Sequence, residues 1–354
     1  MYRTADDVSD PPGGRPADSP AAPGTDTPTG PRTEARTEAR TAVFLAERRR
    51  LLLLAYRMLG SLTEAEDVVQ EAWLRWQAAG QAGTAIRNEA AWLTTVVTRL
   101  CVDHLRSSRL RREQYVGPWL PEPIAGVDHG LGPLEVVEQR ATLSLAMLAL
   151  LERLSPRERA AVVLAEAFGY SHGEIAEMLG IGYAASRQIH SRAMRRLAGS
   201  RRRHRPVSPR KHRELLERFL DAAGTGDLGE LTSVLVDDAV LTSDGGGEVR
   251  SAVRPVRGAG RVARFLLGST ARLPAGLQAG LLPINGLPQL VLATADGEPV
   301  LVLAVYGTDR VTDLALVAAP AKLASVRAAL AGSPGGPAQS SWRSTYGMIP
   351  PWRK

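Results

Sequence analysis

The chain has 354 residues, of which 44% are hydrophobic and 23% charged, and it carries a formal net charge of +7. This length predicts two or three domains, and this composition excludes a chain that is disordered throughout. The single cysteine, Cys101, excludes an intramolecular disulfide and a cysteine-rich zinc site, and it fits a reducing cytoplasm. No stretch approaches the ~18 apolar residues of a membrane span, so we expect a cytoplasmic protein that does not contact a membrane.

The first 40 residues differ from the rest of the chain. Residues 1–40 hold seven Pro and no Leu, Ile, Phe or Trp. Such a segment buries too little apolar surface to offset the entropy of ordering, so it predicts a disordered leader.

Residues 41–114 have a helical pattern throughout. We expect a first helix that ends at Gly60, a second that starts in a Thr63–Glu66 capping box, and a third that starts after Asn88. The third helix is apolar in its first half and basic in its second half. The second helix is amphipathic, with Val69, Ala72, Trp73 and Trp76 on the apolar face and Asp67, Gln70, Glu71 and Leu74 on the other.

A linker rich in Pro and Gly, residues 115–133, precedes a second helical block at 134–205. In the linker, Trp119 stands between Pro118 and Pro121, which predicts a preorganised apolar anchor. In the second block, capping boxes at Ser155 and Ser171 each start a helix. The turn LGIG then leads into a basic last helix, which gives a helix-turn-helix signature.

The basic helix predicts a DNA-binding element. From Tyr183 to Arg205 there are eight arginines and no acidic residue, so this segment suits phosphate contacts that release counterions. The first residues of such a helix enter the major groove, whereas later ones contact the backbone. The candidate base-reading residues are Ala184, Ser186, Arg187, Gln188 and His190; the candidate backbone contacts are Arg192 and Arg195.

Residues 210–330 predict an α+β domain. Two helical stretches, 212–224 and 227–236, come first. Strands are then expected at 239–243, 248–256, 277–284, 289–295, 299–307 and 310–318, with a hairpin turn at Asp296-Gly297. The tail from 331 to 354 is read as flexible, although its aromatic residues Trp342, Tyr346 and Trp352 leave open that it docks somewhere.

Over roughly residues 44–199 the chain resembles regions 2 and 4 of a bacterial RNA polymerase sigma factor of the extracytoplasmic-function type. The stretches that carry the resemblance are RLLLLAYRMLGSLTEAEDVVQEAWLRW, AAWLTTVVTRLCVDHLRSSRLRRE and LSPRERAAVVLAEAFGYSHGEIAEMLGIGYAASRQIHSRAMRRL. The resemblance implies two all-α domains, region 2 at 41–114 and region 4 at 134–205. It implies core RNA polymerase, through the clamp helices of its largest subunit and its flap region, and promoter DNA as partners.

The resemblance also implies roles for particular residues. Core polymerase binding falls to Asp67, Gln70, Glu71 and Leu74; recognition of the −10 element to Arg99, Asp103, Arg106 and Arg109; and recognition of the −35 element to the helix from Tyr183, with the candidates above. For −10 melting, the loop from Gly80 to Arg87 is the better candidate for a pocket that holds a flipped base, because Trp92 lies on an apolar stretch that favours core packing.

The resemblance extends to a subfamily with a fused, cone-shaped SnoaL-like domain, related in fold to nuclear transport factor 2 and ketosteroid isomerase. It implies that this domain regulates the sigma regions in cis. The implied regulatory residues are Trp119, Leu120, Pro121, Asp244, Gly245, Gly246, Gly247 and Lys322. Two departures from the subfamily are Glu248, where a lysine is usual, and Ala319-Pro320-Ala321-Lys322-Leu323, where the usual sequence is Asn-Pro-Asp-Lys-Leu.

The fold resemblance leaves two alternatives open. The C-terminal domain would be a small-molecule sensor or an isomerase- or cyclase-like enzyme, attached to a helix-turn-helix regulator. Since His212 is its only histidine and it has no cysteine, mainly Asp and Tyr proton chemistry remains, for example Asp244 or Asp296 with Tyr306. The interpretation as a sigma factor involves neither catalytic residues nor a cofactor or metal, and an unknown ligand in the C-terminal domain remains possible.

Overall fold

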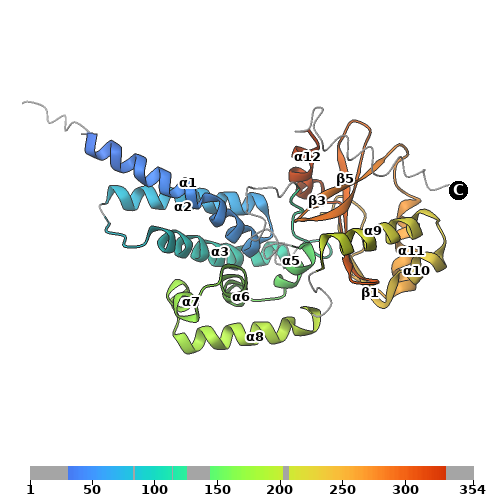
Figure 1. The fold of residues 1–354 in the computed structure, drawn as a ribbon, viewed down its shortest axis with the longest axis horizontal. Coiled ribbons are helices and arrows are strands. Elements are labelled where there is room, and N and C mark those ends of the chain that lie inside the picture. The colour runs from blue at the N-terminus through green and yellow to red at the C-terminus, as the bar shows by residue number, and fades with distance from the viewer. Residues whose placement is uncertain (1–30, 83, 114, 126–143, 202–206, 332–354) are drawn as a thin grey trace, which may run out of the picture.

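The computed structural model describes residues 31–82, 84–113, 115–125, 144–201 and 207–331. The expected leader at 1–30, the linker and region 4 residues at 126–143, and the aromatic tail from 332 lie outside the described residues. Figure 1 shows a helical part on one side of the molecule and a sheet with its own helices on the other, with α5 between them. No helix in the described ranges combines the length and apolar character needed to cross a membrane.

Region 2 is a bundle of three long helices. They are α1 (Pro31–Leu59), α2 (Leu62–Gln81) and α3 (Glu89–Glu113). Their core contains Leu54, Ala72, Trp76 and Leu93, all fully buried, and the Trp92 ring packs against Trp76 with centroids 5.5 Å apart. The expected core position of Trp92 is therefore confirmed, and its ring supports the bundle.

Two predictions for this bundle are wrong. Residues 31–40 belong to α1, because Pro31 starts a run of good helix formers and Arg40 packs its guanidinium 3.5 Å from the centre of the Trp76 ring. Helix α2 is capped by Ser61, whose side chain accepts a hydrogen bond from the Glu64 amide, so Thr63 lies inside the helix. The expected caps at Gly60 and Asn88 are confirmed.

Region 4 contains α5 (Leu145–Leu151), α6 (Pro156–Phe168), α7 (His172–Leu179) and α8 (Tyr183–Arg201). Both predicted capping boxes are present, at Ser155 with Glu158 and at Ser171 with Glu174. Helix α7 ends at Gly180, whose φ of 62° lies in the left-handed region that glycine adopts at low cost. The turn after it leads directly into α8, as the helix-turn-helix pattern predicts.

The C-terminal domain is a curved six-stranded sheet with helices. Its helices are α9 (Pro209–Gly224), α10 (Leu228–Ser233), α11 (Ala259–Thr270), the 3-10 turn η1 (Pro320–Leu323) and α12 (Ala324–Ala331). Its strands are β1 (Leu235–Asp244), β2 (Val256–Arg257), β3 (Gln278–Ile284), β4 (Leu287–Ala293), β5 (Pro299–Gly307) and β6 (Val311–Val317). The strand order is β2-β1-β6-β5-β4-β3, and all neighbouring pairs are antiparallel except β1 with β6.

The two faces of this sheet have different partners. One face packs on α9, α10 and α11, through residues such as Leu216, Phe219 and Val262. The other face packs on the linker and α5, through Leu120 and Leu145 among others, and on α12. The sigma-like part and the C-terminal domain therefore share a hydrophobic core.

Two expectations for this domain are wrong. Most of the strand expected at 248–256 is a loop, because Gly245 accepts hydrogen bonds from the amides of Glu248 and Val249 and turns the chain. Helix α11 was not expected; its buried side chains Val262, Ala263 and Leu266 have helical spacing, but the glycines at its start hid it.

Candidate functional site

The four residues expected to bind core polymerase share one face of α2. Asp67, Gln70 and Leu74 are exposed, and Leu74 keeps 54% of its surface accessible. Glu71 is half-buried and accepts a hydrogen bond from Arg75 at 2.9 Å. The positions i, i+3, i+4 and i+7 give one acidic face with an apolar centre, opposite the buried Trp76.

The expected −10 residues share one face of α3, but one of them is engaged elsewhere. Asp103 and Arg106 are exposed and pair with each other at 3.3 Å; the Arg109 side chain lies outside the described part of the structure. Arg99 donates through Nε to the Met178 carbonyl at 2.9 Å and through Nη2 to the Glu177 carbonyl at 3.2 Å. These carbonyls are at the end of α7, where helix carbonyls lack intrahelical donors. The expectation that Arg99 is free to bind DNA is therefore wrong for this conformation.

Other contacts hold region 4 against region 2. Arg50 on α1 donates to the Tyr170 hydroxyl at 2.9 Å and to the Thr94 hydroxyl at 2.7 Å. Arg159 on α6 donates to the Met58 carbonyl at 2.8 Å. In Figure 1, α6, α7 and α8 accordingly lie along α3. The helix-turn-helix is packed on the helix expected to contact the −10 element.

Arg57 is an unusual cation at this interface. Its side chain is 2% exposed, its guanidinium lies 5.0 Å from the centre of the Phe168 ring, and its nitrogens make no hydrogen bond to a described residue. Burial lowers the pKa of Arg57 to about 10. A buried cation without a carboxylate partner is costly, so the contact between regions 2 and 4 includes an unfavourable component.

Most of the expected −35 residues are exposed on α8. Tyr183, Ala184, Arg187 and Gln188 project from its first half, and Arg192 and Arg195 from its second. Ser186 is fully buried, because its position turns it toward α7, where its hydroxyl lies 3.4 Å from His172 Nδ1. His190 is half-buried, with Nε2 3.2 Å from Glu166. The expectation of base reading by Ser186 is wrong, and His190 is partly turned toward α6.

The expected interdomain residues converge on one carboxylate. Asp244, at the end of β1, is fully buried and accepts four hydrogen bonds. The donors are the Tyr115 hydroxyl at 2.6 Å, the Leu120 amide at 2.8 Å, the Gly246 amide at 3.0 Å and Lys322 Nζ at 2.7 Å. Burial, followed by the bond to Asp244, raises the pKa of Tyr115. We call this group of residues the linker hub.

Lys322 completes the hub. Its ammonium also donates to the Leu120 carbonyl at 2.6 Å and lies 4.0 Å from the centre of the Trp119 ring. The linker is therefore held by an ion pair, by its own backbone and by a cation–π contact. The glycines after Asp244 are needed for this fit, because a Cβ on Gly245 would lie 1.9 Å from the Val249 carbonyl oxygen and one on Gly246 would lie 3.0 Å from Ala319.

The same linker caps region 2 on its other side. Glu122 accepts from the Ser61 hydroxyl at 2.7 Å and from the Leu62 amide at 2.8 Å, at the start of α2. Trp119 packs on Gly60, where a Cβ would lie 2.7 Å from the ring. Pro121, beside it, is buried. The start of the helix that carries the expected polymerase-binding face is thus fixed by the linker.

Asn285 connects the two domains directly. Its side-chain amide donates to the Tyr56 hydroxyl at 2.8 Å and accepts from the Ile124 amide at 3.1 Å, and its own amide donates to the Ile124 carbonyl at 2.8 Å. The Tyr56 hydroxyl in turn donates to the Glu122 carbonyl at 2.6 Å. Sequence reasoning missed Tyr56, Tyr115, Glu122 and Asn285. The Asn285-Gly286 pair marked a turn, and nothing in the sequence indicated its partner.

The residues suggested for proton chemistry lie apart. Asp296 is exposed in the hairpin turn after β4, and Asp244 belongs to the linker hub. Tyr306 is buried and pairs with Asp313, whereas Asp244 pairs with Val317, four residues further along β6. At about 3.3 Å per residue this separates them by roughly 13 Å. The sheet face on which Tyr306 lies is covered by the linker and α5.

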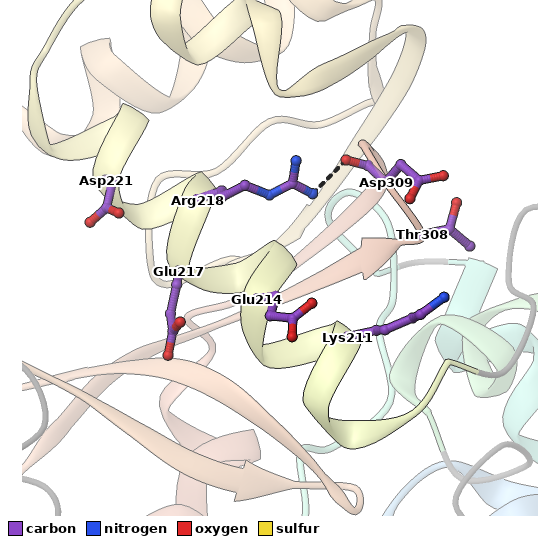
Figure 2. A pocket seen from close by; sticks show the side chains of 7 residues that line it. All are labelled: Lys211, Glu214, Glu217, Arg218, Asp221, Thr308 and Asp309. Carbon is purple, nitrogen blue, oxygen red and sulfur yellow. Dashed lines mark hydrogen bonds between the residues drawn. The ribbon is translucent and has the colours of Figure 1, made fainter.

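A hollow of about 430 Å³ lies elsewhere, along the outer side of α9. Figure 2 shows Lys211, Glu214, Glu217, Arg218 and Asp221 on this helix facing Thr308 and Asp309, with Arg218 bonded to the Asp309 carbonyl. Its lining is charged and exposed, unlike the apolar lining typical of small-molecule sites.

Comparison with known proteins connects these surfaces. Sigma-70 region 2 matches residues 43–111 and Sigma-70 region 4 matches residues 144–197. The chain is 42% identical to the ECF RNA polymerase sigma factor SigJ of Mycobacterium tuberculosis over 66% of this chain and 74% of that protein. It is 36% identical to the probable ECF RNA polymerase sigma factor SigI of the same species, over 82% of this chain and 97% of that protein. The crystal structure of M. tuberculosis SigJ superposes with a TM-score of 0.64 at 36% identity, over 80% of this chain and 98% of SigJ.

Proposed function

Because the chain belongs to the extracytoplasmic-function RNA polymerase sigma factors, which direct promoter-specific initiation, we propose how its surfaces divide that work and how its C-terminal domain controls it. The face of α2 with Asp67, Gln70, Glu71 and Leu74 binds the clamp helices of the largest polymerase subunit. Its exposed Leu74, ringed by carboxylates and an amide, suits a basic helical partner. Region 4 contacts the flap region, and the site of action is the cytoplasm.

Promoter recognition uses two basic helices. The face of α3 with Asp103, Arg106 and Arg109 contacts the −10 element, joined by Arg99 once region 4 moves away from it. Tyr183, Ala184, Arg187 and Gln188 of α8 read the −35 element, and Arg192 and Arg195 contact phosphates. Exposure of these side chains on α8 supports this assignment.

The described conformation is a closed state of the factor. Arg99 is bonded to α7, so α3 cannot present it to DNA while the helix-turn-helix is packed there. Opening releases Arg99 and relieves the burial of the Arg57 cation. Binding to core polymerase favours the open state by the difference in its affinity for the two states.

Regulation in cis passes through the linker hub, and the hub is the observation that carries the proposal. Asp244 and Lys322 hold Leu120 and Trp119, and Glu122 of the same linker caps α2. A shift of the C-terminal domain therefore reaches the start of the polymerase-binding helix through five residues of linker. The covered sheet face gives no support to an enzymatic or ligand-sensing role.

The test compares hub variants in binding and in transcription. Asn285→Ala removes the contact with Tyr56 and Ile124 and leaves the α2 face and α8 unchanged. We expect altered affinity for core polymerase and altered promoter-specific output, with Thr312→Ala, on the same domain but outside the hub, as the control. If Asn285→Ala matches wild type in both measurements while the hub is confirmed to be loosened by hydrogen exchange at Glu122, regulation through the linker is excluded.

A further inference from the structure

One segment of the C-terminal domain carries a large share of the positive charge. From residue 249 to residue 295 there are six arginines and no Asp or Glu. All six side chains are exposed, and within the described part of the chain none forms an ion pair or a side-chain hydrogen bond. The six are Arg250, Arg254, Arg257, Arg261, Arg264 and Arg272.

The acidic residues of this domain are concentrated on other elements. Seven of them lie on α9, α10 and the first half of β1, or next to these elements: Glu214, Glu217, Asp221, Asp227, Glu230, Asp237 and Asp238. Figure 2 shows three of these carboxylates on α9, around the hollow described above. Solvated surfaces usually mix both signs, whereas separation of this kind creates a field that attracts a charged partner.

The arginines continue a basic surface that begins in region 2. The loop that carries Arg250 and Arg254 packs on the residues that follow α3: a Cβ on Gly247 would lie 3.6 Å from the Val116 side chain, and one on Gly117 would lie 3.6 Å from Val253 Cα. The last two turns of α3 hold four arginines, at positions 106, 109, 111 and 112. From this loop the chain runs through β2, with Arg257, into α11, with Arg261 and Arg264.

We propose that the C-terminal domain itself contacts promoter DNA, through an arginine strip formed by Arg250, Arg254, Arg257, Arg261 and Arg264. The strip binds phosphates of the duplex next to the −10 element, which α3 contacts. This proposal rests on the proposed role of α3, because continuity with its basic end is what selects DNA as the partner. Exposed arginines that project from a rigid surface bind the phosphate backbone and add affinity without reading bases.

The test measures the salt dependence of promoter binding. The full chain, assembled with core RNA polymerase, is titrated against a fluorescent promoter duplex at several salt concentrations. The variant is Arg261→Gln/Arg264→Gln on α11, and the matched control is Arg210→Gln/Arg213→Gln, a pair with the same spacing on the exposed face of α9. Each lost phosphate contact lowers the slope of log K against log salt by about 0.9, so we expect the α11 variant to lose up to about 1.8 from the slope.

Three further readings separate the possible outcomes. The α11 variant should weaken binding to the same extent on promoters with altered −35 bases and should bind core polymerase with wild-type affinity. A wild-type slope for the α11 variant, or an equal effect of the α9 control, overturns the proposal. Weaker binding to core polymerase with an unchanged slope also overturns it and assigns the strip to an acidic protein surface. Initiation by the wild type is read separately, so its absence contradicts the proposed function and not the strip.

Discussion

Lys322 Nζ lies 2.7 Å from Asp244 Oδ2, and this ion pair, in which the lysine is 9% exposed and the aspartate fully buried, holds the linker between the two halves of the protein. Both partners also bond Leu120, one through its carbonyl and one through its amide. The C-terminal domain therefore holds a segment of backbone that lies on the start of α2.

Asp244→Asn should destabilise the protein strongly. The change keeps the shape of the side chain but leaves the Lys322 ammonium buried without a counter-charge, which costs about 3–5 kcal/mol. Urea unfolding measures the loss. The double variant Asp244→Asn/Lys322→Met should lose less than the sum of the two single variants, because it removes both charges. Additive losses would show that the pair is not coupled.

Arg99→Ala should open the contact between regions 2 and 4. The variant loses both hydrogen bonds to the end of α7, and a lysine at this position would not replace them because it lacks the planar fork. Dyes on Ser107→Cys and Ser191→Cys report the distance between α3 and α8. The native Cys101 stays unlabelled, because it is buried and burial raises the pKa of its thiol.

We expect lower energy transfer in Arg99→Ala than in wild type. Arg106→Ala is the matched control, because Arg106 lies on the same face of α3 and bonds only its neighbour Asp103 among described residues. Equal energy transfer in all three proteins would contradict the closed state described above.

Arg187→Ala should reduce discrimination at the −35 element. A forked arginine contact to guanine contributes about 1–3 kcal/mol of discrimination, so binding to the preferred site should weaken while binding to altered sites changes little. The measurement is a competition between promoter duplexes with single substitutions. Ser186→Ala is the control, since Ser186 is buried against His172, and it should leave base preference unchanged. A changed preference in the control would restore Ser186 as a reading residue.

Asp67→Ala/Gln70→Ala should weaken binding to core polymerase and leave the fold intact, because both side chains are exposed and make no contact with the bundle core. Fluorescence anisotropy with labelled factor gives the affinity. Glu66→Ala, an exposed carboxylate about a quarter turn away on α2, is the control. If Glu66→Ala and the double variant lose the same affinity, the effect is one of net charge and not of this face.

His212 should make the stability of the C-terminal domain depend on pH. Burial lowers its pKa, although the bond to the Pro288 carbonyl opposes this. As pH falls below the ordinary histidine pKa of about 6.5, the unfolded chain takes up a proton that the folded chain does not, so stability falls. His212→Gln keeps an amide donor and cannot titrate, so its unfolding free energy should change less between pH 7 and pH 5, as urea titrations at each pH will show.

Local sequence signals predicted the helices well and the contacts between domains poorly. Ser155, Ser171 and Gly60 acted through neighbours within a few residues, so their roles follow from the sequence alone. The position of Arg99 on α3 was also predictable, but its partner lies 78 and 79 residues further along the chain, and no local pattern specifies such a pair. The strand expected at 248–256 failed because Gly245 closes a turn that its alternating residues do not reveal.

The hub shows the same limit. Asp244, Trp119 and Lys322 were found through a family resemblance, whereas Glu122, Tyr56 and Asn285 were not found at all. Each of the missed residues has an ordinary local context, and its role arises from a partner in another domain.

The most direct test of the account is run-off transcription with core RNA polymerase on a genomic promoter library, comparing wild type with Asp244→Asn/Lys322→Met. We predict that the wild type initiates downstream of a shared pair of −35 and −10 elements, and that the hub variant uses the same promoters with changed output. No promoter-specific initiation by the wild type, or identical output from the two proteins, would contradict it.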